Sequence, residues 1–97
     1  MSAKFKILKQ RQSENLHLNL SGDFNDMSVC ELIDVLRDNC HSVMRVFIHT
    51  KNLDKVSTSN IGRDVFYKNL NIMNDDSFQI QFTGGYDNKL FPKQIHV

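Results

Sequence analysis

The chain has 97 residues, with 12 lysines and arginines against 11 aspartates and glutamates, and a formal net charge of +1. This length predicts one domain, residues 1–97, with a single core and no room for a second domain. The near-zero net charge argues against nucleic acid and anionic membranes as partners, because both require a strongly positive surface.

Apolar runs in the sequence are all shorter than the roughly 20 residues that span a bilayer, and Met1 to Arg11 lacks the apolar core of a secretion signal. We therefore expect a cytoplasmic protein with no membrane insertion. Cys30 and Cys40 fall ten residues apart on one expected helix and form no C-x-x-C pattern. They predict reduced, buried thiols, and we expect no bound metal and no cofactor.

The first elements alternate in hydrophobicity. Residues 5–9 and 16–20 read F-K-I-L-K and L-H-L-N-L, which predicts a β-hairpin or two adjacent strands, with His17 facing solvent or a neighbouring strand. A loop over residues 21–25 follows, and its glycine permits a turn. Ser28 and Glu31 then predict a capping box at the start of an amphipathic helix.

The second half of the chain repeats this order. Residues 43–48, V-M-R-V-F-I, predict a central strand covered on both faces, closed by a hydrogen-bonding His49. Three hydroxyl residues at 57–59 mark the start of a second helix, whose apolar positions recur with helical period from Ile61 to Met73. Residues 78–83 alternate as a half-buried strand, and a helical turn over residues 89–91 precedes Pro92 in the tail.

This order of elements predicts an α/β two-layer sandwich, because right-handed crossovers place both helices on one face of a mixed sheet. The sheet should have four or more strands, and its other face is left to the tail or to a partner. No constellation of residues supports acid–base or nucleophilic catalysis, so we expect no enzyme.

Two short motifs carry a family resemblance. The runs L-H-L-N-L-S-G-D-F-N from Leu16 and L-D-K-V-S-T-S-N-I-G from Leu53, with the helix between them and the strand V-M-R-V-F-I-H-T, together resemble the STAS domain family. This family includes bacterial anti-sigma factor antagonists and the cytosolic domains of sulfate transporters. The resemblance covers most of residues 16–82 and implies a STAS-like two-layer fold with helices mainly on one face.

The resemblance also implies a functional surface. Gly22 and Asp23 match the glycine and acidic residue of the first family motif. The family's D-S-S-G motif aligns with residues 57–60, so that its phosphorylatable serine corresponds to Ser59, with Thr58 as the neighbouring candidate. Ser57 replaces the usual aspartate and Asn60 the usual glycine.

The partner-binding residues expected from this alignment share one end of the sheet. They are Gly22, Asp23, Phe24, Asn25, Ser57, Thr58, Ser59 and Asn60. We expect Phe24 to be partly exposed as an apolar anchor, and a phosphate at a helix start to be partly stabilised by free backbone N–H groups.

Two functions follow from the resemblance. The first is a non-enzymatic regulatory domain that docks an anti-sigma factor or serine kinase-like protein and is switched by phosphorylation at Ser59. The alternative is a non-phosphorylated STAS subunit that docks on a transporter ATPase or another multiprotein assembly. In that alternative the three hydroxyls at 57–59 only cap the helix.

Overall fold

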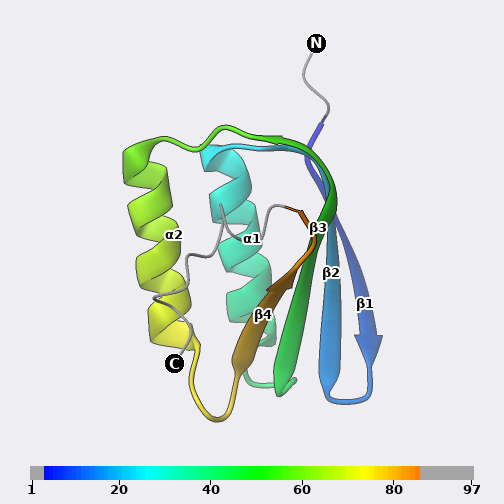
Figure 1. Ribbon diagram of the computed structural model, residues 1–97. Coiled ribbons are helices and arrows are strands. Elements are labelled where there is room, and N and C mark those ends of the chain that lie inside the picture. Colours follow the sequence, from blue (N-terminus) through cyan, green and yellow to red (C-terminus); the bar gives the residue numbers. More distant parts are fainter. Residues whose placement is uncertain (1–3, 86–97) are drawn as a thin grey trace.

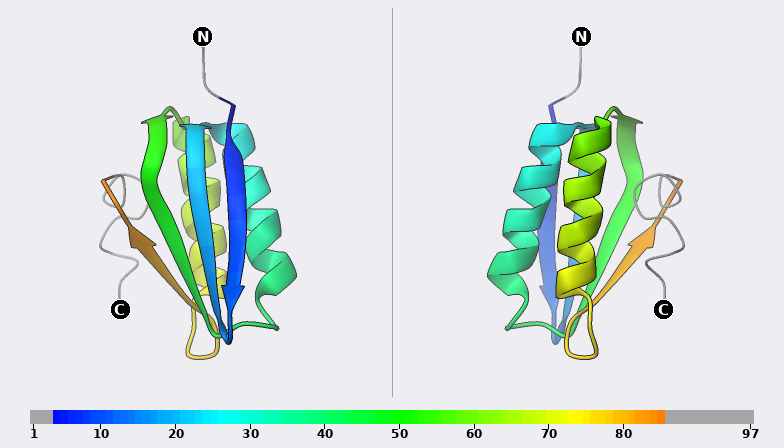
Figure 2. Two further views of the ribbon diagram at one scale, coloured as in Figure 1. Left: turned by 90° about the vertical axis from the view of Figure 1, so that its right-hand side faces the viewer. Right: turned by 90° about the vertical axis from the view of Figure 1, so that its left-hand side faces the viewer.

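The computed structural model describes residues 4–85 as a four-stranded sheet with both helices packed on one face (Figures 1 and 2). This is the predicted two-layer α/β architecture. In chain order the elements are β1 (Lys6–Gln12), β2 (Asn15–Phe24), α1 (Asp26–Asn39), β3 (Arg45–Val56), α2 (Asn60–Met73) and β4 (Gln79–Thr83). The expected turn at residues 89–91 lies outside the described residues.

The sheet is mixed, as predicted. Its strands follow in the order β1-β2-β3-β4; β1 is antiparallel to β2, and β3 is parallel to both β2 and β4. Parallel neighbours require a crossover connection, which α1 supplies between β2 and β3 and α2 between β3 and β4. The ends of β2 and β3 that lead into the two helices therefore meet at one edge of the molecule.

The alternation of side chains sets the core. On β2, Leu16, Leu18 and Leu20 are fully buried beneath the helices, whereas the residues between them are only half-buried. Phe78, Ile80 and Phe82 are all buried, as their spacing predicted. Alternating residues point to opposite faces of a strand, so one face of the sheet faces the helices and the other does not.

The two long strands differ from their predicted lengths. β2 continues through the expected loop to Phe24, and β3 begins at Arg45 and continues to Val56. The polar segment at the end of β3 pairs with the end of β2 through backbone groups, which do not depend on side-chain hydrophobicity. His49 consequently lies within the strand, not at its end. The expectation that this strand is covered on both faces is wrong for the described residues, because α1 and α2 share one face.

Helix α1 begins earlier than predicted. Its N-cap is Asn25, whose side-chain oxygen accepts a hydrogen bond from Ser28 N at 3.1 Å, while Asn25 N donates to Ser28 Oγ at 3.1 Å. Ser28 is thus the third helical residue of the capping box and not its first member, because Asn is an equally strong cap three residues earlier.

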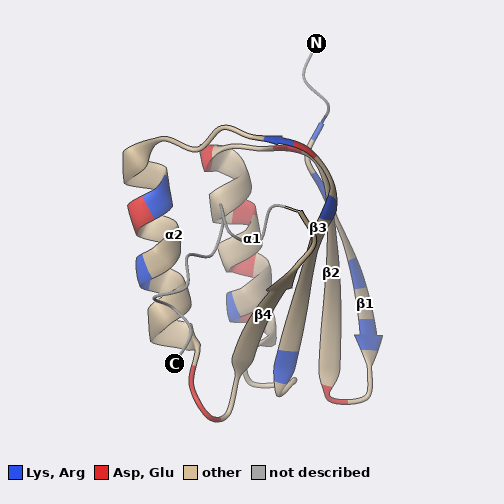
Figure 3. Ribbon diagram, in the orientation of Figure 1, with Lys and Arg blue, Asp and Glu red and all other residues tan. Residues whose placement is uncertain are grey.

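The cysteines are free thiols, and the prediction that both are buried is wrong. Cys30 is exposed and Cys40 is half-buried at the C-cap of α1. Charges of both signs lie on each helix (Figure 3). Neither of the described helices is both long enough and apolar enough to cross a bilayer.

Candidate functional site

The connections that lead into α1 and α2 lie side by side at one edge of the sheet. Asp23 pairs with Lys55 and Phe24 with Val56 in the parallel ladder. Ser57 N donates a 2.8 Å hydrogen bond to the carbonyl oxygen of Phe24. The structure thus brings the two sequence motifs together, as the order of the strands predicted.

Exposure divides the expected binding residues into two groups. Asn25, Ser57, Ser59 and Asn60 are exposed and Thr58 is partly exposed. Gly22, Asp23 and Phe24 are buried. The residues of the first motif, Gly22 and Asp23, are therefore part of the interior below the site. The second motif, residues 57–60, exposes hydroxyl and amide groups to solvent.

Phe24 is not an exposed anchor, and that prediction is wrong. Its side chain is 0% exposed and packs edge-on against Phe5 and Phe66, each with ring centroids 5.6 Å away. The reason is that β2 continues to residue 24, so the side chain turns into the core. The polar run around Gly22 and Asp23 resembles a surface loop in sequence, but Phe24 is the last residue of β2.

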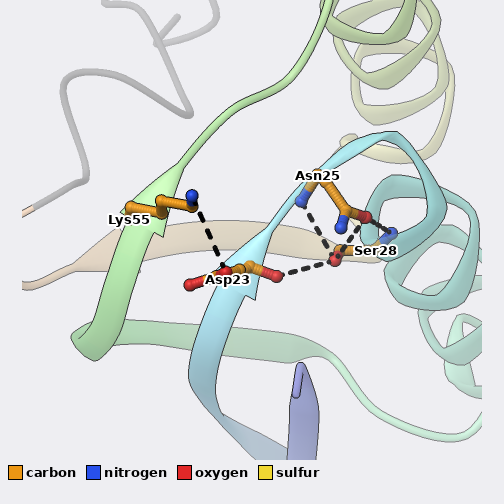
Figure 4. Close-up of polar contacts among 4 residues, drawn as sticks. All are labelled: Asp23, Asn25, Ser28 and Lys55. Atoms are coloured by element: carbon orange, nitrogen blue, oxygen red, sulfur yellow. Dashed lines mark hydrogen bonds and ion pairs between the residues drawn. The ribbon is translucent and has the colours of Figure 1, made fainter. Parts of the chain in front are cut away.

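Asp23 is a buried carboxylate at the end of β2. Its Oδ2 has no hydrogen-bond partner among the described residues, and the ammonium of Lys55 lies 4.0 Å away (Figure 4). The backbone carbonyl of Asp23 accepts a 3.1 Å hydrogen bond from Ser28 Oγ, which ties α1 to β2. A buried polar atom without a hydrogen bond is costly, and Lys55 is the cation that lies near this oxygen.

Ser59 is the N-cap of α2, and its hydroxyl has two partners. Oγ accepts a 3.0 Å hydrogen bond from Gly62 N and donates a 2.6 Å hydrogen bond to Asp26 Oδ2. Ser59 N also donates to Asp26 Oδ1, at 2.8 Å. We refer to these two bonds between Ser59 and Asp26 as the Ser59–Asp26 clasp. It joins the first turns of the two helices at the exposed edge of the molecule.

The clasp favours the ionised form of Asp26. The hydrogen bond from the Ser59 hydroxyl, followed by the bond from the Ser59 backbone, lowers the pKa of this carboxyl below its ordinary value of 3.8. Asp26 also lies in the first turn of α1 and faces the first turn of α2. Helix N-termini attract negative charge, so both helices stabilise this carboxylate.

Gly62 makes the close approach of Asp26 possible. A Cβ atom at residue 62 would lie 2.7 Å from Asp26 Cγ, which is too close for two carbon atoms. Asn60, the residue aligned with the family glycine, is an ordinary first helical residue and has no positive φ. Sequence reasoning missed Asp26 and Gly62, although the G in S-N-I-G was a signal that a helix-interior glycine serves close packing.

Comparison of the sequence with models of known protein families finds no match, and comparison with curated proteins finds none either. Solved structures do match the fold. An anti-sigma factor antagonist from Mycobacterium paratuberculosis superposes with a TM-score of 0.61 at 12% identity, covering 96% of this chain and 76% of that chain. The Bacillus cell fate determinant SpoIIAA in its phosphorylated form superposes with a TM-score of 0.60 at 12% identity, covering 94% and 83%.

This chain has a STAS-like fold. A larger protein, Mglu, also contains a segment of this shape, with a TM-score of 0.67 and 15% identity over 80% of this chain. The STAS-like domain corresponds to only 19% of the length of Mglu. At these identities the likeness concerns the fold alone.

Exposed apolar side chains flank the clasp of this STAS-like domain. Met27, next to Asp26, is 77% exposed, and Ile61, two residues after Ser59, is 78% exposed. The sequence placed Ile61 and Val65 on the buried face of α2, and for both this is wrong. The buried side of the helix carries Phe66 and Leu70, and five residues along an α-helix correspond to about 140°, so Ile61 faces away from Phe66.

Proposed function

We propose that this STAS-like domain is a non-enzymatic regulatory module that binds a protein partner at the N-terminal ends of α1 and α2. The partner-binding surface comprises the exposed groups of Asn25, Met27, Ser57, Ser59, Asn60 and Ile61. The observation that carries the proposal is the Ser59–Asp26 clasp, an exposed serine hydroxyl held between two helix starts. Met27 and Ile61 take the role of apolar anchors that Phe24 cannot fill.

Phosphorylation of Ser59 is the proposed switch, and an anti-sigma factor or serine kinase-like protein is the proposed partner. Ser59 is more accessible than Thr58. A phosphate on Ser59 Oγ removes the proton donated to Asp26 and adds a charge of about −1.5 to −2. Two negative groups would then face each other where a 2.6 Å hydrogen bond existed. The modification would therefore open the clasp and place unpaired charge between the apolar anchors.

The clasp is also compatible with the alternative function, a docking subunit that is not phosphorylated. The Ser59 hydroxyl already donates to Asp26 and accepts from Gly62 N, so it has a structural role without any modification. A domain that is never phosphorylated would keep the clasp as a fixed part of its docking surface. It would then act as a subunit bound to a transporter ATPase or another multiprotein assembly.

Affinity measurements distinguish the two functions. The natural partner is isolated by pull-down with the full chain and its affinity is measured for wild type, Ser59→Ala and Ser59→Asp. A switch predicts that Ser59→Asp weakens binding by orders of magnitude, because a desolvated unpaired charge costs several kcal/mol, whereas Ser59→Ala changes it by about tenfold or less. Equal affinity in all three proteins would reject the switch and leave permanent docking. Equal loss in both variants would indicate a direct hydrogen bond from Ser59 to the partner.

A matched pair of variants tests the surface itself. Ile61→Ala should weaken binding, and Ile72→Ala should not, because Ile72 is 80% exposed on the same helix but lies near its opposite end. Met27→Ala should behave like Ile61→Ala. If Ile72→Ala alone weakened binding, the partner would occupy a different part of α2 and the proposed surface would be wrong.

A further inference from the structure

The sheet face that does not carry the helices holds a chain of hydrogen bonds across three strands. His17 Nδ1 on β2 lies 2.9 Å from His49 Nε2 on β3. His49 Nδ1 lies 2.7 Å from Thr83 Oγ1 on β4. The two imidazole rings are parallel to within 1°, with centroids 5.2 Å apart, so they meet edge to edge in one plane.

The register of the sheet creates this contact. His17 pairs with Phe47, and Asn19 pairs with His49, so the two histidines are diagonal neighbours on adjacent parallel strands. Both rings are partly buried, and the Phe47 ring lies nearly parallel to the His17 ring with a centroid distance of 5.1 Å. Two ring nitrogens are therefore held opposite each other by the sheet and by a packed aromatic neighbour.

We propose that His17 Nδ1 and His49 Nε2 form a two-histidine chelate for a borderline divalent metal ion such as Zn²⁺, Ni²⁺ or Cu²⁺, with water in the remaining positions. Imidazole nitrogens coordinate such ions at about 2.0–2.1 Å. Two ligands at that distance, at right or tetrahedral angles to the metal, lie about 2.8–3.4 Å apart. The observed separation of 2.9 Å lies within this range. Each ring must turn so that its lone pair points at the metal, because the two nitrogens now face each other directly.

Binding of the metal to the two neutral histidines does not require the release of a proton. One proton lies between the two facing nitrogens when both rings are neutral. The metal takes its place, and the ring that held the proton carries it on its other nitrogen instead. Where His49 is that ring, its Nδ1–H donates to Thr83 Oγ1. A hydrogen bond from the outer nitrogen is the usual way in which proteins orient a metal-bound histidine.

The surrounding charges select the kind of metal. The two histidines lie in two adjacent register rows of the sheet, whose other members in the described part of the chain are Gln10, Phe47 and Gln81 in the row of His17 and Leu8, Asn19 and Thr83 in the row of His49. None of these is a carboxylate, so Mg²⁺ and Ca²⁺ lack the oxygen anions they prefer.

The ligand count sets the expected strength. Among residues 4–85, no group of three or more histidine, cysteine, aspartate or glutamate side chains surrounds a common point. A two-histidine chelate should therefore bind in the micromolar range, weaker than a four-ligand structural zinc site. It is independent of the proposed partner-binding surface, because neither histidine belongs to that surface.

The test uses the full chain without an affinity tag, with Cys30→Ser and Cys40→Ser to remove thiolate ligands. Ni²⁺ is titrated in a chelator-free buffer at pH 7.5 and followed by calorimetry, with Mg²⁺ as the negative probe. We expect one Ni²⁺ per chain, no Mg²⁺ binding, and at least a tenfold loss of affinity in His17→Gln and in His49→Gln. The matched controls are His41→Gln and His96→Gln, which should bind as the parent does.

A second measurement does not depend on substitution. Paramagnetic Ni²⁺ should broaden the amide NMR signals of the parent protein around His17, His49 and Thr83 before any others. Broadening centred elsewhere, unchanged affinity in His17→Gln and His49→Gln, or a loss confined to the two control variants would each overturn the proposal.

Discussion

Asp26 and Ser59 are 33 residues apart in sequence, and the carboxylate of one accepts both the backbone and the hydroxyl hydrogen bond of the other, at 2.8 and 2.6 Å. A residue in the first turn of α1 thus completes the N-cap of α2. The candidate phosphorylation site is consequently a property of two helices together. A substitution of Asp26 should therefore alter the hydrogen bonds of Ser59, and a substitution of Ser59 should alter those of Asp26.

The clasp predicts that the effect of a negative charge at residue 59 depends on residue 26. Ser59→Ala should lower the free energy of unfolding by about 1 kcal/mol through the lost cap. Ser59→Asp keeps a capping oxygen but sets two carboxylates against each other, so it should also destabilise the protein. In an Asp26→Asn background the same Ser59→Asp change should be nearly neutral, because the repulsion is gone. Urea unfolding of the parent protein, Ser59→Asp, Asp26→Asn and the double variant measures the coupling between the two residues. Additive changes in the free energy of unfolding would mean that the clasp does not form in solution.

The effect of Gly62→Ala on stability should change sign when Asp26 is removed. Replacing Gly62 by alanine should destabilise the parent protein, because the new Cβ displaces Asp26 and breaks the clasp. In an Asp26→Ala background that obstacle is absent, and Gly62→Ala should instead stabilise the protein by up to about 1 kcal/mol through helix propensity. Thermal and urea unfolding should be measured with and without Gly62→Ala, in the parent protein and in the Asp26→Ala background. Stabilisation by Gly62→Ala in the parent protein would show that Asp26 is free to move away at little cost.

His49 predicts a loss of stability in mild acid. Burial, followed by the charges of His17 and Lys51, lowers its pKa below the ordinary value of 6.5. The unfolded chain therefore takes up a proton at a higher pH than the folded protein does. The contribution of this group to stability should be complete above pH 6.5 and decline as the pH falls from there towards the lowered pKa. Urea unfolding at several pH values in the presence of a chelator should show this decline, and His49→Gln should reduce it; an unaltered pH profile in His49→Gln would assign the decline to other groups.

Replacing Phe24 should reduce the stability of the fold, whereas the sequence suggested a partly exposed residue that binds a partner. Phe24→Ala should lower the free energy of unfolding by about 3–5 kcal/mol, because the ring is fully buried between Phe5 and Phe66. Met27→Ala, three residues later and 77% exposed, should change it by no more than about 0.5 kcal/mol. Chemical denaturation compares the two directly. Similar small losses in both variants would be incompatible with the burial of Phe24.

Local patterns predicted the secondary structure and the face of most side chains. The alternation over residues 16–20 and 78–83 correctly separated buried positions from half-buried or exposed ones, and the hydroxyl residues correctly marked the start of α2. Both rest on short-range geometry, the two-residue repeat of a strand and the unsatisfied N–H groups of a helix start. Strand ends and the first cap were less accurate, because backbone pairing between β2 and β3 continues through residues whose side chains give no strand signal.

The sequence by itself determined a mixed two-layer α/β domain and the place of Ser59 at a helix start, because hydrophobic period and capping chemistry are encoded within a few neighbouring residues. Only the tertiary structure decided that Asp26 holds Ser59, that Gly62 leaves the space for it, that Phe24 is buried, and that His17 meets His49. Each of these relationships depends on the register and packing of elements that are not neighbours in a local stretch of the chain. A one-residue change of register would turn every side chain of a strand to its other face, so no local pattern could have settled them.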